Sequence, residues 1–335
     1  MISLRNAGLA ILFYVATSSI LPAQTTLFQD NFDTNTAGNW SVNSVAGSTI
    51  NTAAFAFDYS TVGIPAAPGG TTTLGLKLQA NVNPSPTDGQ VTGTFSGISV
   101  SPLGKSFTGD YTLRFQAWQN APGPFPGGGA GSTQMTGGGL GAVTTTAQFP
   151  GTAVDGVYFN ASGEGGTATD YRAYVNVGAP IANTTPGVYA AGTQAGSTNN
   201  TDPYYQQFGG ISPPAAQTTL FPQQTGTTMT GTLGFAWHQW DIAKSGNIVT
   251  WSVDGKLIAT VDITTELFAG DNIFLGQYDI NATTTTGADR DLLFGLIDNV
   301  MVFTPVPEPA SILGISAAGL AGLGWLRRRV MRRAN

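Results

Sequence analysis

The side chains of this sequence that could carry chemistry are mainly carboxylates. Of the 335 residues, 19 are Asp or Glu, one is His and none is Cys. The missing thiols exclude disulfides, thiolate zinc sites and a cysteine nucleophile. A lone histidine, His238, excludes a histidine cluster for a metal. Any metal or acid–base chemistry of this chain must therefore rest on oxygen atoms.

Paired catalytic carboxylates are not evident in the sequence. Alternate residues of a strand point to one face, and retaining glycoside hydrolysis needs two carboxyl groups about 5–5.5 Å apart. Between the two ends of the chain the only glutamates are Glu164 and Glu266, which are far apart. Asp289 and Asp291 alternate, but they follow a Thr-rich turn, where a solvated pair is the ordinary interpretation. A G-x-S-x-G elbow for serine hydrolysis is also absent. The sequence therefore predicts a protein that is not an enzyme.

Three aspartates are the candidate ligands of a cation. Calcium binds carboxylate and backbone carbonyl oxygens. Asp30 and Asp33 lie near one end of the chain's main segment and Asp298 near the other. They would form a structural calcium site if the fold brought these two ends together. The alternative is that such Asp and Asn residues cap turns.

Aromatic side chains near two long segments are the candidates for binding a polysaccharide. Exposed rings can stack on sugar faces, while Asn, Asp and Gln side chains bind sugar hydroxyl groups. The segments are residues 120–141 and 178–224, rich in Gly, Pro, Asn and Thr. The rings that border or lie in them are Trp118, Phe125, Tyr204 and Tyr205. Local packing of these rings, and disorder of the segments, are the alternatives.

Strands must position these groups, because helical periodicity is nearly absent between residues 25 and 305. Short runs rich in Val, Ile, Thr and aromatic residues alternate there with clusters of Gly, Asn, Asp and Pro, as is typical of an all-β sandwich or barrel. The predicted strands are Ala53–Tyr59, Thr73–Gln79, Gln90–Val100, Tyr111–Trp118, Val154–Asn160, Tyr171–Val177, Thr232–Ile242, Ile248–Val253, Lys256–Asp262, Asn272–Tyr278 and Leu292–Phe303.

Two segments allow a more specific prediction of local structure. Asp254-Gly255 separates two alternating runs and favours a type I′ hairpin, which needs positive φ at both turn positions. The segment Asn120–Gly141, with its many Gly and Pro residues, is predicted to form no regular strand.

The N-terminal end is typical of a signal peptide. Arg5 precedes the apolar run Ala7–Ala16, and Ala23 is a plausible cleavage position, so residues 1–23 are expected to be removed on secretion. Without its two ends the chain keeps seven basic and eighteen acidic residues. This acidic balance favours solubility and cation binding, and it argues against nucleic acid as a partner.

The C-terminal end has three parts in order. Val306, Pro307, Glu308 and Pro309 precede the apolar run Ala310–Leu326, which as a helix would reach about 25 Å, and a cluster of arginines follows. Residues 306–333 closely resemble the PEP-CTERM sorting signal of Gram-negative bacteria. The resemblance implies an exosortase-type transpeptidase as partner, transient insertion in the inner membrane, and a destination at the cell surface or matrix. A plain C-terminal membrane anchor is the alternative.

A second resemblance concerns the segment between these ends, residues 24–305. Its residues 237–256, together with Phe28–Asp33 and Ile297–Val300, resemble strands of concanavalin A-like and laminin-G-like sandwiches. The resemblance implies an antiparallel jelly roll with adjacent first and last strands, and a structural calcium near them. Laminarinase-type glycosidases of this fold carry an ExDxE pattern, which this sequence lacks.

The two resemblances together imply a function. We expect a secreted, non-catalytic protein of the cell surface or extracellular matrix that binds polysaccharide. A divergent glycoside hydrolase or lyase, and a purely structural matrix or adhesion protein without a specific ligand, are the alternatives.

Overall fold

The computed structural model describes residues 24–44, 51–81, 96–126, 133–148, 155–166, 170–175, 200–264, 268–279 and 288–304. The chain divides into two units, of which Thr26–Thr304 is one and the two ends of the chain are the other. The predicted signal peptide (1–23) and sorting tail (306–333) lie outside the described residues. Within the described ranges, no helix is long and apolar enough to span a membrane.

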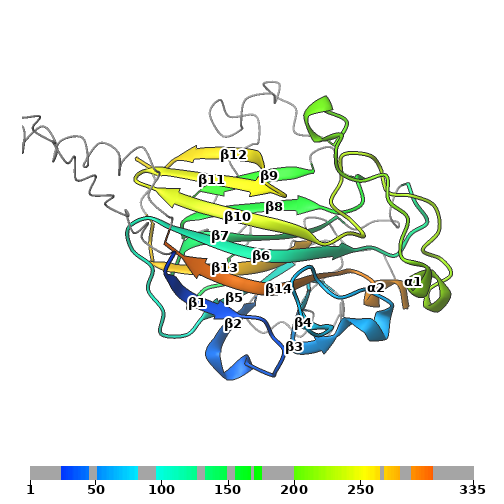
Figure 1. The fold of residues 1–335 in the computed structure, drawn as a ribbon, viewed down its shortest axis with the longest axis horizontal. Coiled ribbons are helices and arrows are strands. Elements are labelled where there is room, and N and C mark those ends of the chain that lie inside the picture. Colours follow the sequence, from blue (N-terminus) through cyan, green and yellow to red (C-terminus); the bar gives the residue numbers. More distant parts are fainter. Residues whose placement is uncertain are drawn as a thin grey trace, which may run out of the picture. The chain divides into compact units, whose positions relative to one another are not determined.

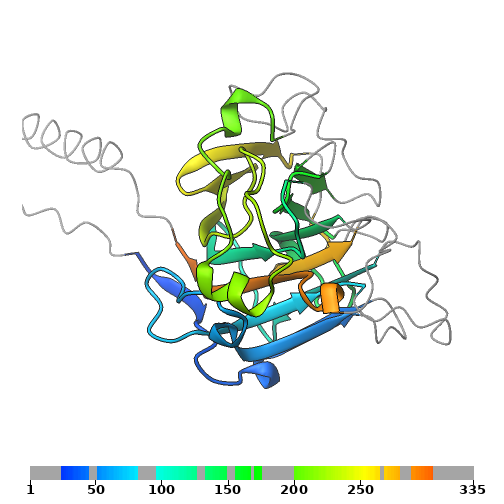
Figure 2. The ribbon, with the colours of Figure 1, turned by 90° about the vertical axis from the view of Figure 1, so that its right-hand side faces the viewer.

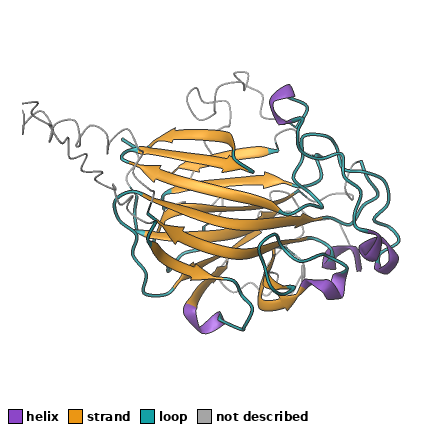
Figure 3. Cartoon of the chain, in the orientation of Figure 1, coloured by secondary structure: helices purple, strands orange, loops and turns teal. Residues whose placement is uncertain are grey.

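Thr26–Thr304 forms a sandwich of two antiparallel sheets, drawn in Figures 1 and 3. The larger sheet has eight strands in the order β12 (Lys256–Asp262), β11 (Ile248–Val253), β10 (His238–Ser245), β6 (Tyr111–Asn120), β14 (Phe294–Phe303), β4 (Leu74–Gln79) and β3 (Thr52–Asp58), with β1 (Thr26–Asp30) paired to β14. The smaller sheet runs β2 (Trp40–Ser44), β5 (Ser96–Pro102), β13 (Asn272–Asp279), β7 (Gln134–Ala142), β8 (Val157–Ser162) and β9 (Tyr171–Val175). The predicted all-β antiparallel class is confirmed.

The helices are short and lie in the connections. They are η1 (Ala37–Asn39), η2 (Tyr59–Val62), η4 (Pro203–Tyr205), α1 (Ala215–Leu220) and α2 (Ala288–Asp291). Figure 2 shows α1, α2 and the long connection before β10 gathered at one end of the sandwich. The predicted long segment 178–224 is described from residue 200 on, where it contains η4 and α1 and no strand.

Alternation along the strands builds the core between the sheets. In β10, Trp240 and Ile242 are buried in that core, whereas Gln239 and Asp241 point to the opposite face and are partly exposed. A second apolar cluster, which includes Trp118, covers part of the outer face of the larger sheet. Both layers are needed to cover a sheet whose strands are apolar on more than one face.

The predicted hairpin is confirmed. Asp254 and Gly255 join β11 to β12, and their φ angles are 49° and 76°. The strand predicted over Thr232–Ile242 begins only at His238. Phe235, with φ 62°, interrupts the extended backbone before that point.

Strand β7 corrects the prediction that Asn120–Gly141 contains no regular strand. It occupies Gln134–Ala142, between β13 and β8 in the smaller sheet. A Cβ at Gly137 would lie 1.9 Å from the Phe159 carbonyl oxygen, and one at Gly139 would lie 2.2 Å from the Val157 carbonyl oxygen. Glycine is therefore required here by the close approach of β8, and it does not signal a loop.

The first and last strands of the sandwich are neighbours. β1 pairs antiparallel with β14, and Thr26 lies opposite Phe303. The polypeptide therefore enters and leaves the sandwich at adjacent positions.

A glycine substitution tests the packing of β7. We expect Gly139→Ala to lower the free energy of unfolding by about 2 kcal/mol or more, because overpacking a filled site typically costs about 1–3 kcal/mol. Gly38→Ala is the matched control, since a Cβ there meets nothing within 4 Å. Urea denaturation of residues 24–304 measures both. Equal effects of the two substitutions would contradict the assigned packing.

Candidate functional site

The structure brings Asp30, Asp33 and Asp298 together beside the β1–β14 pair. Asp30 ends β1, and Asp298 lies on β14 where its register with β6 shifts before Met301. The Asp298 carboxylate accepts hydrogen bonds from Asn299 N at 2.6 Å and from the Tyr59 hydroxyl at 3.1 Å. The charges of Asp30 and Asp33 act on Asp298, so the three aspartates form one acidic cluster.

Asp298 is the unusual member of the acidic cluster. Burial, with 2% of the residue exposed, raises its pKa to about 7. The charges of Asp33 and Asp30 act in the same direction, while the hydrogen bonds from Asn299 and Tyr59 lower the pKa. Burial and the charge of Asp298 also raise the pKa of Tyr59. The cluster consequently favours a proton on Asp298 near neutral pH.

The carboxylate oxygens of the acidic cluster already accept hydrogen bonds from the protein, an arrangement that does not fit a calcium site. The two carboxylate oxygens of Asp30 accept hydrogen bonds from Phe32 N at 2.9 Å and from Trp40 Nε1 at 2.8 Å. Asp33 accepts hydrogen bonds from the side chains of Asn31, Thr71 and Thr72. In the part of the chain that the structure describes, no group of three or more Asp, Glu or His side chains could hold a metal ion. N–H and O–H groups of the protein therefore bind the carboxylate oxygens that were expected to bind calcium.

A groove of about 360 Å³ opens next to the acidic cluster. We call it the β1–β14 groove. Its walls combine an aromatic ring, a carboxylate, amide side chains and a hydroxyl. They are Phe28, Gln29, Asp30, Asn31, Thr36, Asn39, Asn299, Val300 and Met301. The ring of Phe28 is half-buried, whereas Gln29, Asn31 and Asn39 are exposed. This lining can contact an apolar face and bind hydroxyl or amino groups.

The aromatic side chains predicted to bind a glycan are mostly inside the protein, which corrects that prediction. The exposed fractions of Trp118, Phe125 and Tyr205 are 2%, 7% and 0%. Tyr205 stacks on Tyr171 with 4.1 Å between ring centroids. Their burial leaves no ring face for a sugar, so local packing explains them.

The fourth predicted ring, Tyr204, is half-buried and engaged on one side. The Nζ atom of Lys256 lies 3.9 Å from its ring centroid, and its hydroxyl donates a hydrogen bond to the Leu257 carbonyl at 2.5 Å. Tyr204 thereby covers the free edge of β12, which gives it a structural role.

A polar and aromatic cluster on the outer face of the smaller sheet was not predicted. The Tyr174 and Tyr278 hydroxyls lie 2.6 Å apart, and Tyr278 donates to Asn160 Oδ1 at 3.2 Å. The Tyr158 hydroxyl and Asn160 Nδ2 are buried without a hydrogen-bond partner. Their alternation with core residues in β8 is the sequence signal that could have revealed this face.

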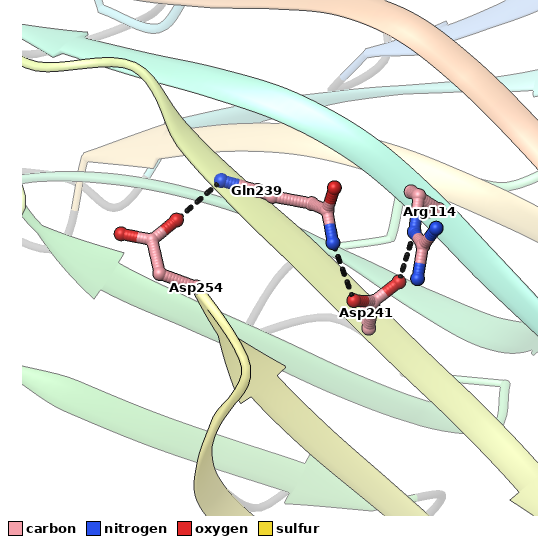
Figure 4. A network of polar contacts seen from close by, with 4 residues as sticks. All are labelled: Arg114, Gln239, Asp241 and Asp254. Carbon is pink, nitrogen blue, oxygen red and sulfur yellow. Dashed lines mark hydrogen bonds and ion pairs between the residues drawn. The ribbon is translucent and has the colours of Figure 1, made fainter. Parts of the chain in front are cut away.

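The single histidine forms no catalytic dyad with a nucleophile. His238 Nδ1 lies 2.6 Å from Asp254 Oδ2, while Nε2 is buried without a partner. The other Asp254 oxygen accepts a hydrogen bond from Gln239 N, and Figure 4 shows the network continuing through Asp241 to Arg114. These contacts fix the hairpin turn against β10 and leave no reactive hydroxyl at the ring.

Glu164 is a further buried acid outside the acidic cluster. Burial and the charge of Asp170 raise its pKa to about 8. One of its carboxylate oxygens, Oε1, has no hydrogen-bond partner. Glu266, the second glutamate of the main segment, lies outside the described residues.

The comparison with protein families confirms the sorting tail. Residues 305–329 match the PEP-CTERM protein-sorting motif. This motif is the recognition signal of exosortase and indicates export and sorting in Gram-negative bacteria. The sequence matches no protein of curated function.

The chain resembles solved β-sandwich structures at low sequence identity. A galectin-like protein of unknown function from Bacillus subtilis is 9% identical, with 85% of this chain and 100% of that chain covered and a TM-score of 0.41. A laminarinase from Flavobacterium sp. UMI-01 is 12% identical, with 84% and 100% covered and a TM-score of 0.42. The potassium-bound carbohydrate recognition domain of Emp46p is 8% identical, with 79% and 88% covered and a TM-score of 0.37.

The raised pKa of Asp298 predicts a pH-dependent effect of Asp298→Asn. The stability that a protonated Asp298 contributes is fully present below its unfolded-state pKa of 3.8 and is lost as the pH rises through about 7. We therefore expect the variant to match the wild type at pH 4 and to exceed it at pH 8. The expected gain is on the order of 1.4 kcal/mol per unit of pKa shift. Urea denaturation at several pH values measures this difference.

Calcium provides the control for this interpretation. The melting temperature of the wild type at pH 8 should be the same with calcium and with chelator. A calcium-dependent rise that Asp298→Asn abolishes would show instead that the acidic cluster binds the ion, because a ligand of the folded state raises its stability.

Tyr158→Phe tests whether the outer-face hydroxyl has a partner. Removing a buried hydroxyl that has none should leave stability unchanged or raise it by up to about 1 kcal/mol. In the matched control, Tyr171→Phe, the lost hydroxyl donates to the Gly231 carbonyl at 2.7 Å, and a loss of about 1 kcal/mol is expected. Thermal unfolding compares the two. A clear loss in Tyr158→Phe would reveal a partner for this hydroxyl.

Proposed function

We propose that this chain is an exported, non-catalytic protein of the cell surface or extracellular matrix, and that it binds an uncharged or basic polysaccharide in the β1–β14 groove. The lining of that groove is the observation that carries the proposal. It combines the half-buried ring of Phe28 with the exposed amides of Gln29, Asn31 and Asn39. A ring and several amide groups together match the apolar faces and hydroxyl edges of a sugar.

Charge supports this choice of ligand class. Among the described residues, Asp30 lines the groove and no Lys or Arg does, while Lys105 Nζ lies 5.9 Å from the ring centroid of Phe28. Asp33 adds negative charge beside it, because its charge helps to raise the pKa of Asp298. An anionic polysaccharide would be repelled, whereas neutral sugars and amino sugars would be accepted.

A non-catalytic role is favoured by the arrangement of the acids and the histidine. Hydrolysis by two carboxyl groups needs an open site that holds both, whereas Asp298 and Glu164 are both buried. His238 Nε2 has no hydroxyl partner that it could activate.

The connectivity of the sandwich supports exposure of the groove after sorting. The tail that carries the sorting motif follows directly after β14. β14 also forms one wall of the groove, through Asn299, Val300 and Met301. All fourteen strands of the sandwich lie within the described residues 26–303, ahead of the sorting motif in the sequence.

A retention assay on insoluble polysaccharides tests the proposal. We expect residues 24–304 to be retained on a neutral or amino-sugar polysaccharide, and Gln29→Ala with Asn39→Ala to weaken binding about tenfold or more. Both side chains are exposed, so the stability of the fold should not change. Asn247→Ala, an exposed asparagine in the β10–β11 turn, is the matched control.

Three other results would count against the proposal. Retention on no polysaccharide would favour a purely structural protein. Retention that is unaffected by the double substitution would remove the groove as the site. Release of new reducing ends from a bound polysaccharide would show the protein to be an enzyme.

A further inference from the structure

The connection between η2 and β4, residues 63–73, covers the buried carboxyl group of Asp298. A Cβ added to Gly70 of this connection would lie 3.7 Å from Asp298 Oδ2. We call residues 63–73 the covering loop. Its exposed residues are Pro65, Ala66, Pro68, Gly69 and Thr71. The contacts that hold this surface loop in place therefore also keep Asp298 buried.

The Tyr59 hydroxyl joins the covering loop to β14. Its oxygen lies 3.2 Å from the Thr72 carbonyl oxygen and 3.1 Å from Asp298 Oδ2, and it accepts a hydrogen bond from Ala67 N at 3.1 Å. Thr72 and Ala67 belong to the covering loop, whereas Asp298 belongs to β14. Tyr59 is 0% exposed, so its hydroxyl depends on these partners within the protein.

A count of protons shows which state of Asp298 satisfies all three contacts. A hydroxyl group donates one hydrogen bond and accepts up to two. If Asp298 carries a proton on Oδ2, it donates to the Tyr59 oxygen, and the Tyr59 proton stays available for the Thr72 carbonyl. If Asp298 is ionised, the carbonyl and the carboxylate compete for the single Tyr59 proton. The carboxylate then takes it, because hydrogen bonds to a charged group are stronger.

The surroundings of Asp298 favour its protonated state near neutral pH. Burial and the negative charges of Asp33 and Asp30 raise its pKa to about 7, against the opposing effect of the hydrogen bonds from Asn299 and Tyr59. Burial also raises the pKa of Tyr59, so the hydroxyl keeps its own proton throughout this range. Asp298 is therefore the group of this network that titrates near neutral pH.

The basic side chains of the strands beside Asp298 are engaged elsewhere. Lys77 of β4 lies over two phenylalanine rings, and Arg114 of β6 is paired with Asp241. Gln116, which lies opposite Asp298 on β6, does not ionise. The charge of an ionised Asp298 would consequently be opposed mainly by the hydrogen bonds of the network.

The covering loop is also hydrogen-bonded to both sides of the β1–β14 groove. Two threonines of the loop donate to the Asp33 side chain, which also accepts a hydrogen bond from Asn31. On the other side, Asn299 Nδ2 donates to the Pro68 carbonyl at 3.4 Å. Asn31 and Asn299 both line the groove. Release of the loop would therefore loosen two of the amide side chains that shape the groove.

We propose that Tyr59 and Asp298 form a proton-operated latch, which holds the covering loop against β14 when Asp298 is protonated and releases the loop when Asp298 is ionised. Ionisation takes the hydrogen-bond donor from the Thr72 carbonyl and places a charge beside Asp33 and Asp30. The latch would make binding in the β1–β14 groove tighter at mildly acidic pH than at alkaline pH. This effect on binding rests on the proposed function, whereas the latch itself does not.

Hydrogen–deuterium exchange of the full chain tests the latch without a ligand. At pH 8.5 we expect a peptide that contains Ala67 to exchange about tenfold faster in the wild type than in Asp298→Asn, because the latch is then mostly open in the wild type. The amide introduced by the substitution donates to Tyr59 at every pH and keeps the loop closed. At pH 5.5 the two proteins should exchange equally.

Two controls accompany the exchange experiment. The hairpin over β11 and β12 should stay protected during the time in which the covering loop exchanges, because local opening does not break its hydrogen bonds. Asp110→Asn, which changes an exposed acid outside the acidic cluster, should behave as the wild type does. Exchange of the loop and the hairpin together would show that the opening is global and would overturn the latch.

Retention on cellulose and on insoluble β-1,3-glucan at pH 5.5 and 8.5 tests the link to the groove. Both polymers are uncharged, so their own charge does not change with pH. We expect wild-type binding to be about tenfold weaker at pH 8.5, since only the molecules with a closed latch bind fully. Asp298→Asn should bind equally at both pH values.

The outcomes separate the latch from the proposed function. Retention on neither polymer, together with pH-dependent exchange of the covering loop, would support the latch and count against the groove as a polysaccharide site. Wild-type retention that is equal at both pH values would overturn control of the groove by the latch. Exchange of the covering loop that is the same in the wild type and in Asp298→Asn at pH 8.5 would overturn the latch, whatever the retention.

Discussion

The break in β14 at Asp298 is the constraint on which the site region depends. Before the break, Gly295–Ile297 pairs with β4, and after it Val300–Phe303 pairs with β1. Two strands thus share one edge of β14, with Asn299 at a φ of 50° between them. The gap between β4 and β1 receives the Asp298 carboxyl and the Tyr59 hydroxyl. The β1–β14 groove exists because β1 meets the sheet only beyond this point.

Much of the fold could be predicted from the sequence because alternation and turn chemistry are local properties. The hairpin over β11 and β12 is an example, since Asp254-Gly255 and the flanking runs are sufficient to define it. β7 could not be predicted, because its glycines are explained only by the approach of Phe159 and Val157 from β8. That contact joins two different strands, and the pattern of residues within β7 alone does not reveal it.

The candidate site was predictable only in part for the same reason. The residue types identified Asp30, Asp33 and Asp298, and the pairing of first and last strands was implied by resemblance. Their hydrogen-bond partners, such as Trp40 and Tyr59, come from other elements and decide that the cluster is satisfied by protein groups. The burial of Trp118, Phe125 and Tyr205 likewise depends on outer layers that cover the sheets. The position of an aromatic residue next to a loop in the sequence does not show whether other segments of the chain bury its side chain.

The position of β14 also determines how the body would respond to mechanical load. The sorting motif follows its C-terminal end in the sequence, so a pull on that end along the strand axis would be transmitted first to β14. Antiparallel hydrogen bonds run perpendicular to the strand axis. Such a pull would therefore shear the bonds of β14 to β6, β4 and β1 together, without opening them one by one. The sandwich therefore resists a pull along β14 through the bonds of three neighbouring strands at once.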